Sequence, residues 1–425
     1  MSAIIRLWPQ YEAVAAWWRT RRLARRLRTR ADVEAWQRLR LERLQHRIMP
    51  RTAFYADAAT RRFDELPIVD KGLLMSRFAD FNQPRISAEA GWQALANGGR
   101  IGAYFVGAST GTSGNRGLYV ISEAERWRWL GTMVAKTMPR LRRARIALIL
   151  PLDTSLYATA RRSLFDFRFF DLKAGLEVCG ADVASFDPDT LIAPPKVLRW
   201  LSQHGGPLTR VRHVFSAAEV LDPADRAIIE TRFGVIVREI YMATEGLLGV
   251  ACVQGRLHLC EDVMKFEFER PVAGGALVSP IITDFSRETQ AMVRYRMNDL
   301  LRLDDRPCPC GSPMQAVLQV EGRVDDMLQF STAGGIAPVT PDILRNAIVG
   351  ADRRIDDFRL VQTGSDQLEL WLLQSLPPEA REAARGSLEN LLGGLGMQPQ
   401  IDVKTAQTLE VTSRKLRRVE RRWQS

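Results

Sequence analysis

Residues 106–117 read Val-Gly-Ala-Ser-Thr-Gly-Thr-Ser-Gly-Asn-Arg-Gly, with four glycines and four hydroxyl residues in twelve positions. An apolar run at 101–106 precedes this stretch and another at 118–121 follows it, which predicts a strand, a small-residue loop and a second strand. Glycine lets successive backbone N–H groups turn toward one point, and Ser and Thr add short donors, so the loop suits a polyphosphate. It is not a Walker P-loop, because it lacks Gly-Lys-Ser/Thr and precedes a strand. An ordinary glycine-rich hairpin is the alternative.

The length of 425 residues exceeds what one hydrophobic core usually supports, so we expect at least two domains. Apolar residues make up 46% and charged residues 26%, as in soluble globular proteins. No apolar run is long enough for a membrane span, and no basic segment precedes an apolar one at the N-terminus, so we expect no signal peptide. Five cysteines in this length favour a reducing cytoplasm over a disulfide scaffold.

The net charge of +11 is concentrated at the two ends of the chain. Residues 1–50 hold twelve arginines against four acidic residues, and residues 413–425 hold six basic residues against one glutamate. Basic ends can bind nucleic acid, but no base-stacking or DNA-reading motif accompanies them, so we expect no nucleic-acid partner. An acidic protein, a membrane surface and a plain solvated helix face remain as interpretations.

The middle of the chain alternates between strand and helix patterns, which predicts an α/β sheet. Strands are expected at 146–150, 176–178, 211–215 and 235–241, and helices at 10–48, 122–138 and 222–233. Residues 155–170 carry seven large apolar or aromatic side chains, which indicate either a core helix or the lining of an acyl or aryl pocket. After Gly322 the pattern predicts a separate α+β unit, with a hairpin, helices near 341–349 and 378–393, and strands near 358–362 and 367–373.

Five short blocks carry a resemblance to a known family. They are Ser109–Gly117, Tyr241-Met-Ala-Thr-Glu245, Tyr295-Arg-Met-Asn-Asp299-Leu300, Gly322-Arg323-Val-Asp325-Asp326 and Thr412-Ser-Arg-Lys415-Leu-Arg-Arg418. In this order and spacing they resemble the adenylate-forming superfamily of acyl-CoA synthetases and adenylation domains, above all its phenylacetate–CoA ligase branch. The resemblance covers the chain from about residue 66 and implies a large α/β domain (66–324) and a small mobile α+β domain (325–425). Residues 1–65 are expected to form an Arg-rich helical extension packed on the large domain.

The same resemblance implies a role for each block in activating a carboxylic acid with ATP. Thr244 would donate to the α-phosphate, Glu245 would hold Mg²⁺ as an oxygen ligand, and Lys415 would bridge the carboxylate and the phosphate. Asp325 would serve as the hinge between the domains. The remaining nucleotide contacts would come from Ser109, Thr110, Gly111, Thr112, Ser113 and Gly114 (β,γ-phosphates), Arg116, Ala217, Ala218 and Glu219 (adenine side), Tyr241, Met242, Ala243, Asp299 (ribose) and Arg323.

The loop departs from the family's pattern at the position of its usual lysine. Asn115 and Arg116 stand where the family usually carries Lys and Pro. Neutralising the phosphates is therefore expected to fall to Arg116.

Two pairs of cysteine and histidine residues form a candidate structural zinc site, although the Cys-x-Cys spacing is tighter than in common zinc knuckles. Cys308-Pro-Cys310 puts two thiols on one turn, and Cys252 precedes His258 by six residues. Both pairs resemble zinc-binding segments of some phenylacetate–CoA ligase relatives, and three thiolates with one imidazole would make a closed tetrahedral site. Cys260 could replace His258, and free buried cysteines are the alternative.

The function expected from these features is formation of an acyl-AMP from an aromatic or hydrophobic acid, followed by transfer to the thiol of CoA or of an acyl carrier protein. The Arg-rich ends would suit an acidic carrier protein, because opposite potentials speed encounter. Two alternatives remain open. One is transfer of the acyl group or of AMP to an amine or hydroxyl, and the other is a non-catalytic nucleotide- or nucleic-acid-binding protein.

Overall fold

The computed structural model describes residues 2–109, 116–138, 144–150, 165–172, 175–332, 335–355, 357–409 and 418–423. The chain forms two compact units. Unit 1 comprises Met1–Phe268, Pro280–Met297 and Leu303–Leu318. Unit 2 comprises Glu269–Ser279, Asn298–Arg302 and Gln319–Ser425.

A parallel sheet forms the centre of unit 1, with the strand order β5-β4-β6-β7-β8. Its strands are β4 (Ala144–Leu150), β5 (Phe165–Asp171), β6 (Thr190–Ala193), β7 (His213–Ala217) and β8 (Val237–Ala243). The sheet continues with antiparallel β9 (Gly246–Ala251) and β10 (Leu257–Leu259). Strands β4 and β6 are almost wholly buried, as expected where helices cover both faces of a parallel sheet.

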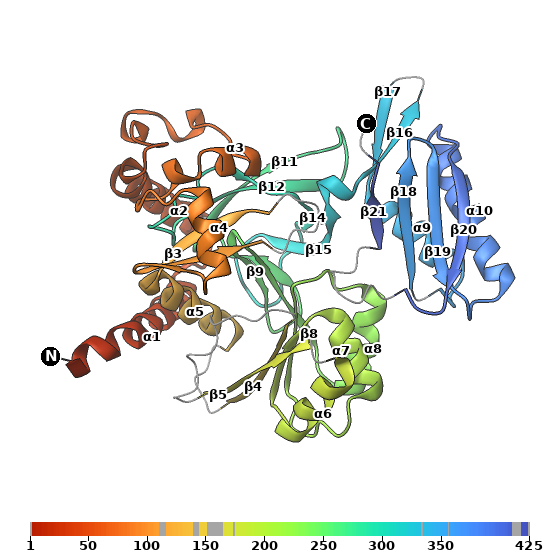
Figure 1. Ribbon diagram of the computed structural model, residues 1–425, viewed down its shortest axis with the longest axis horizontal. Coiled ribbons are helices and arrows are strands. Elements are labelled where there is room, and N and C mark those ends of the chain that lie inside the picture. The colour runs from red at the N-terminus through yellow and green to blue at the C-terminus, as the bar shows by residue number, and fades with distance from the viewer. Residues whose placement is uncertain are drawn as a thin grey trace. The chain divides into compact units, whose positions relative to one another are not determined.

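Helices cover this sheet on two sides (Figure 1). Helices α6 (Leu176–Phe186), α7 (Pro195–His204) and α8 (Pro223–Phe233) pack on one face, where Val183, Leu198 and Ile229 are fully buried. Helix α5 (Glu123–Thr137) contributes Trp129 and Met133 to the core on the opposite face. The resulting helix–sheet–helix layers confirm the predicted α/β class.

Two N-terminal helices, α1 (Ser2–Arg26) and α2 (Arg30–Arg43), dock on unit 1. Helix α1 lies along α5 (Figure 1), and the two approach so closely that a Cβ at Gly131 would lie 2.1 Å from the Ala13 carbonyl oxygen. Helix α2 is attached by an Arg30–Glu261 ion pair of 2.6 Å and by Trp36 Nε1, which donates to the Asp262 carbonyl at 2.8 Å. Part of the Arg-rich segment is therefore used for docking within the chain.

The glycine-rich stretch belongs to a small antiparallel sheet of β1 (Arg100–Ile101), β2 (Tyr104–Ala108) and β3 (Leu118–Ser122). Strands β2 and β3 pair from Tyr104↔Ser122 to Ala108↔Leu118, as the flanking apolar runs predict. Ser122 then caps α5, because its hydroxyl and the Glu125 carboxylate form a reciprocal capping box. Nearby elements of unit 1 are α3 (Lys71–Ser76), α4 (Ala88–Ala96) and β13 (Tyr295–Arg296).

Four of the described strands have residues in both units: β11 (Met264–Glu269), β12 (Leu277–Asp284), β14 (Asp299–Asp304) and β15 (Ala316–Arg323). Short helical turns are η1 (Leu44–Ile48), η2 (Met49–Arg51), η3 (Ala58–Thr60), η4 (Phe63–Glu65), η5 (Phe78–Phe81) and η8 (Val324–Asp326). Within unit 1, β12 pairs with β13 through Ile281↔Arg296 and Ile282↔Tyr295.

Unit 2 has its own α+β core. A hairpin of β16 (Leu328–Thr332) and β17 (Gly335–Val339) accompanies a four-stranded sheet in the order β20-β19-β18-β21. These strands are β18 (Phe358–Gly364), β19 (Gln367–Leu373), β20 (Gln400–Ala406) and β21 (Val419–Arg421). Helices α9 (Pro341–Ala351) and α10 (Pro378–Gly394) pack against the sheet, burying Leu344, Leu388 and Leu392 completely.

Two local predictions are wrong. Residues 176–178 begin helix α6 and not a strand: Cys179, Val183 and Phe186 are buried at helical spacing. The aromatic stretch does not form a helix in its described part, because Phe165–Asp171 is strand β5, paired with β4. Among the described residues, no helix combines the length and apolar character that a bilayer crossing requires.

Candidate functional site

The turn Thr244-Glu245 connects β8 to β9 at the carboxyl end of β8. The last ladder pair of the two strands is Ala243↔Gly246, so these two residues form the tip. Gly246 adopts φ +148°, and a Cβ there would lie 2.4 Å from Met264 Cε and 3.3 Å from an Asp284 oxygen. Only glycine fits this turn without displacing its neighbours. Gly246 is therefore needed for the turn that holds Glu245 in its position.

The end of β7 lies beside this turn. Strands β7 and β8 are parallel neighbours with Ala217 opposite Ile240, so Ala217, Ala218 and Glu219 leave the sheet at the same carboxyl edge as 241–245. Ala218 adopts φ +71°, a left-handed conformation that redirects the chain away from the strand. Lys196 Nζ lies 3.8 Å from Glu219 Oε1. The carboxyl edge of an open α/β sheet is where such folds bind ligands.

Two buried side chains hold the Thr244-Glu245 turn. Arg287 Nη2 donates to the Thr244 carbonyl at 2.6 Å, and Tyr295 donates a hydrogen bond to the Glu245 carboxylate. Arg287 also pairs with Asp284, Nε to Oδ2, at 3.6 Å and stacks over the Tyr119 ring at 5.6 Å. Burial raises the pKa of Asp284, and the Arg287 charge opposes that rise.

The loop that carries Arg287 is itself anchored by Glu125. This carboxylate, 6% exposed, accepts from the backbone N–H of Glu288 at 2.6 Å, from the N–H of Thr289 at 2.9 Å and from the Thr289 hydroxyl. Its capping bond with Ser122 joins the same network to the end of β3. The Glu125 carboxylate therefore holds both the segment that follows the glycine-rich loop and the segment whose Arg287 contacts Thr244.

Ser109 and Gly117 close the neck of the glycine-rich loop. The Ser109 N–H donates to the Gly117 carbonyl at 2.8 Å, and the Gly117 N–H donates to Ser109 Oγ at 2.8 Å. Arg116 is exposed; its Nε donates to the Ser109 carbonyl at 3.2 Å, and its guanidinium lies 5.1 Å from the centre of the Trp92 ring. The predicted phosphate contacts Thr110, Gly111, Thr112, Ser113 and Gly114 lie outside the described residues.

Unit 2 carries the predicted ribose and hinge residues. Asp299 begins β14 and lies 3.9 Å from Arg323, which ends β15. Asn298 Nδ2 donates to an Asp325 oxygen at 2.6 Å, and the Asp325 N–H donates to Asn298 Oδ1 at 3.2 Å. The predicted catalytic Lys415 lies outside the described residues.

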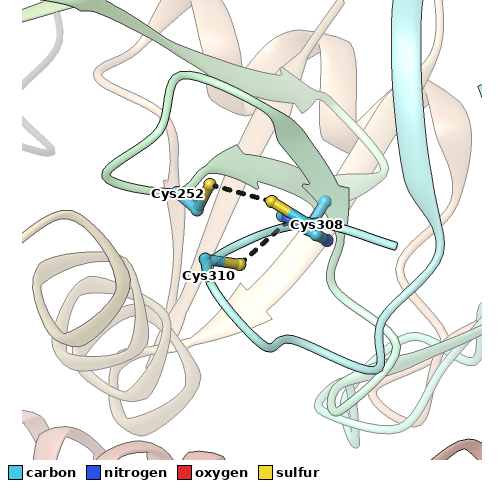
Figure 2. Close-up of side chains that lie close together, drawn as sticks. Cys252, Cys308 and Cys310 are labelled. Carbon is cyan, nitrogen blue, oxygen red and sulfur yellow. Dashed lines mark hydrogen bonds between the residues drawn. The ribbon is translucent and has the colours of Figure 1, made fainter. Parts of the chain in front are cut away.

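Unit 1 also contains a cluster of four potential metal ligands: Cys252, His258, Cys308 and Cys310, whose ligand atoms all lie within 4.8 Å of one another. Figure 2 shows Cys252 on the turn after β9 and facing Cys308 and Cys310, which come from one loop. The Cys252 and Cys308 sulfurs are 3.7 Å apart, and Cys310 Sγ is 3.5 Å from His258 Nε2. The thiol of Cys260 is not among these ligand atoms.

The donor set fits Zn²⁺. A tetrahedral ion with Zn–S bonds of about 2.3 Å and Zn–N bonds of about 2.0 Å requires S···S and S···N edges of roughly 3.8 and 3.5 Å. His258 Nδ1 lies 3.1 Å from the Met314 carbonyl oxygen. This contact leaves Nε2 as the metal-facing nitrogen. Burial lowers the pKa of His258, which favours the neutral imidazole that a metal needs.

The architecture can be compared with known proteins. No model of a known protein family matches the sequence, and no curated protein matches it. Among solved structures, 2-hydroxyisobutyryl-CoA ligase in its postadenylation state superposes with a TM-score of 0.70 at 16% identity, over 92% of this chain and 89% of the other. The chain has the fold of the adenylate-forming ligases.

Two further structures share this ligase fold over a smaller part of the chain. The amide bond synthetase McbA from Marinactinospora thermotolerans has a TM-score of 0.51 at 14% identity, over 71% of this chain and 65% of its own. The anthranilate CoA ligase AuaEII, in complex with anthranoyl-AMP, has a TM-score of 0.50 at 13% identity, over 73% and 65%. At these identities the likeness establishes the fold.

Arg287 was not predicted as a site residue from the sequence. Tyr295 stands in one of the five blocks, but no role was predicted for it. Their function depends on partners 43 and 50 positions away along the chain, since Arg287 bonds to Thr244 and Tyr295 to Glu245. One usable signal was the charged pair Arg287-Glu288, which begins three residues after the fully buried strand β12.

Proposed function

We propose that this chain is an AMP-forming ligase that activates a carboxylic acid with ATP and passes the acyl group to a thiol. The observation that carries the proposal is the Thr244-Glu245 turn, braced by Arg287 and Tyr295 at the carboxyl edge of an adenylate-forming fold. A buried arginine and tyrosine that fix a turn, and not a core element, are typical of a site that must hold its geometry.

In the first step a carboxylate oxygen attacks the α-phosphorus of ATP and the bond to the bridging β-oxygen breaks, so pyrophosphate leaves. Thr244 would donate a hydrogen bond to the α-phosphate, and Lys415 would bridge that phosphate and the carboxylate. Glu245 would hold Mg²⁺, which when bound supplies positive charge next to the phosphate oxygens. In the second step a thiolate attacks the acyl carbon and AMP leaves.

The remaining nucleotide contacts follow the sequence resemblance. Ala217–Glu219 and Tyr241–Ala243, at adjacent strand ends, would form the adenine side. Asp299 would accept from the ribose hydroxyls, with Arg323 beside it at 3.9 Å. We propose that residues 325–425 rotate between the two half-reactions about Asp325, whose side chain is held by Asn298.

The acceptor is proposed to be a phosphopantetheine thiol, either of CoA or of an acidic carrier protein. One structural neighbour is a CoA ligase solved with 2-HIB-AMP and CoA, which favours CoA. A carrier protein is favoured by helix α1, where Tyr11 (71% exposed), Trp18 (60% exposed), Arg22 and Arg25 recur on one helical face. The amide bond synthetase neighbour keeps an amine acceptor as the second candidate.

Three experiments test these proposals. Hydroxylamine trapping of acyl-AMP is carried out with a panel of aromatic and aliphatic acids. At least one acid should give a hydroxamate whose formation requires ATP. Failure with every acid would count against the ligase. With that acid, product analysis separates CoA, carrier protein and amine acceptors.

Reversing Arg22, Arg25 and Arg26 to Glu should slow carrier loading but not CoA loading, whereas reversing Arg61 and Arg62 should change neither.

We also propose that Cys252, His258, Cys308 and Cys310 hold a structural zinc ion. Four protein ligands would leave no open position, so the ion would stabilise unit 1 without taking part in the reaction. The cluster joins the β9–β10 connection to the 308–310 loop, which are otherwise tied by Arg256 donating to the Arg306 and Pro307 carbonyls.

A further inference from the structure

Arg238 is a buried arginine of β8 whose side chain bonds to the end of the neighbouring strand β9. It is 8% exposed, and its Nε and Nη2 both donate to the Ala251 carbonyl, at 3.0 and 2.8 Å. Ala251 is the last residue of β9, and its carbonyl belongs to the peptide bond that leads into Cys252. Arg238 therefore holds the backbone next to one of the four proposed zinc ligands.

The partners of Arg238 carry no full negative charge. Its Nη1 donates to the Thr137 carbonyl at 3.0 Å and its Nη2 to the Lys136 carbonyl at 3.4 Å, both at the carboxyl end of α5. The guanidinium lies 4.6 Å from the centre of the Phe215 ring. A helix end supplies only a partial negative charge. Within the part of the chain that the structure describes, no carboxylate contacts Arg238, although burying a charge without an opposite charge is costly.

Other charged groups beside the cluster have partners of opposite charge. Arg256, Glu261 and Asp304 are close enough to influence the pKa of His258. The ion pairs they form are Arg256–Asp304 at 3.4 Å, Arg306–Asp304 at 2.9 Å and Arg30–Glu261 at 2.6 Å, and Arg306 is exposed to solvent. Arg238 differs from them, because it is buried and has no acidic partner among the described residues.

A zinc ion held by three thiolates and one imidazole would supply the opposite charge. The two positive charges of the ion and the three negative charges of the thiolates leave one net negative charge, since the imidazole is neutral. Burial lowers the pKa of Arg238 to about 10, and the charge of Cys252 opposes that fall. The guanidinium thus stays positive at neutral pH and is close enough to Cys252 for the two charges to interact. Opposite charges attract strongly where burial limits screening by water.

We propose that Arg238 is the counter-ion of the zinc centre and positions Cys252 for the metal. The inference rests on the proposed zinc site. Zinc binding releases the thiol protons and makes the cluster negative, so the charge of Arg238 favours the loaded cluster over the empty one. The hydrogen bonds to Ala251 hold the backbone from which Cys252 reaches the ion. Bound zinc in turn lowers the cost of burying Arg238, so the ion and the arginine stabilise one another.

The test measures the zinc dissociation constant of the full chain by competition with a chromophoric chelator at constant pH. Arg238→Met keeps an apolar stem and removes the charge, so the dissociation constant should rise about 10- to 100-fold, the usual effect of losing an outer partner of a metal ligand. Arg238→Lys keeps the charge and should recover part of the affinity. The control is Arg40→Met, since Arg40 of α2 also donates to a backbone carbonyl, that of Phe285 at 2.9 Å.

Arg40→Met should change the zinc dissociation constant less than about threefold, because Arg40 does not contact the cluster. A second measurement separates zinc binding from general stability. The rise in melting temperature when zinc is added to the metal-free chain should be smaller in Arg238→Met than in the unaltered chain. This difference does not depend on how stable the metal-free variant is.

Three results would overturn the inference. An unchanged zinc dissociation constant in Arg238→Met would show that the arginine serves the fold alone. Equal weakening in Arg238→Met and Arg238→Lys would show that the charge does not matter. If the unaltered chain binds no zinc, the proposed site itself fails and this inference falls with it. Should Arg238→Met not fold, Arg238→Gln, which also removes the charge, decides between the same outcomes.

Discussion

Tyr295 donates its phenolic hydrogen bond to the carboxylate of Glu245. The phenol is 3% exposed, and burial first, then the Glu245 charge, raises its pKa well above the usual range. Tyr295 therefore stays protonated at any physiological pH and always acts as the donor. The bond supports the Glu245 carboxylate from behind, as outer partners commonly support a carboxylate that binds a metal.

Replacing Tyr295 with Phe should raise the Mg²⁺ concentration needed for half-maximal pyrophosphate exchange by about tenfold, because outer-shell partners of metal ligands typically contribute this much. The matched control is Tyr55→Phe. Tyr55 is a second buried phenol of unit 1, and it donates to the Val293 carbonyl at 3.0 Å. Tyr55→Phe should lower the melting temperature without changing the Mg²⁺ requirement. Equal Mg²⁺ curves for Tyr295→Phe and the unaltered chain would contradict the prediction.

Arg287 should act on the rate of the reaction and Arg294 only on stability. Both arginines donate to backbone carbonyls: buried Arg287 donates to Thr244, and partly buried Arg294 donates to Leu66, each at 2.6 Å. Arg287→Ala frees the Thr244-Glu245 turn, so we expect kcat of pyrophosphate exchange to fall about 10- to 100-fold. Arg287→Lys should restore part of that loss. Arg294→Ala should lower the melting temperature with kcat unchanged; similar kcat losses in both alanine variants would refute a positioning role for Arg287.

Zinc should be present at about one ion per chain and should stabilise it. Elemental analysis of the purified protein measures the first point, and the melting temperature before and after chelation measures the second. Cys308→Ser should remove the zinc. Cys179→Ser, which alters a buried thiol of α6 outside the cluster, should keep it. Protein that carries no zinc and melts unchanged with chelator would contradict the proposed site.

Glu125 should make the fold sensitive to acid. Burial opposes ionisation of its carboxyl, but hydrogen bonds from Thr289, Ser122 and Glu288 outweigh it and hold the pKa below the ordinary value of about 4.5. A depressed pKa stabilises the fold above the unfolded-state value, and the stabilisation is lost as the pH falls through the folded-state value. Glu125→Gln should thus melt earlier than the unaltered chain at pH 7.

The difference in melting temperature between Glu125→Gln and the unaltered chain should shrink progressively below about pH 4.5. Glu89→Gln is the control, because Glu89 is also in the first turn of a helix but is exposed. Its melting temperature should track that of the unaltered chain at each pH. A difference for Glu125→Gln that stays constant from pH 7 to pH 3.5 would show that the carboxylate charge does not matter.

Local signals predicted the elements whose ends are marked in the sequence. Ser122 with Glu125 marks the start of α5, the helix expected at 122–138. The strand prediction at 176–178 was wrong because three residues are too few to distinguish the two-residue period of a strand from the 3.6-residue period of a helix. The helical pattern appears only over all eleven residues of α6.

The site could be predicted only where a motif carries it. Thr244 and Glu245 stand in a short block whose composition is recognisable, and the structure puts them on a hairpin tip. The role proposed for Arg287 arises from its contact with Thr244, which lies 43 positions away in the sequence. No motif flanks Arg287, so the sequence does not connect it with this partner.

The central claim is that this chain joins a carboxylic acid to AMP, and ATP–pyrophosphate exchange over an acid panel tests it most directly. The account predicts that labelled pyrophosphate enters ATP only when one particular class of acid is present, without any thiol acceptor. It also predicts that exchange is reduced at least tenfold in Glu245→Gln and in Lys415→Ala. Exchange that needs no acid, or that persists at full rate in both variants, would contradict it.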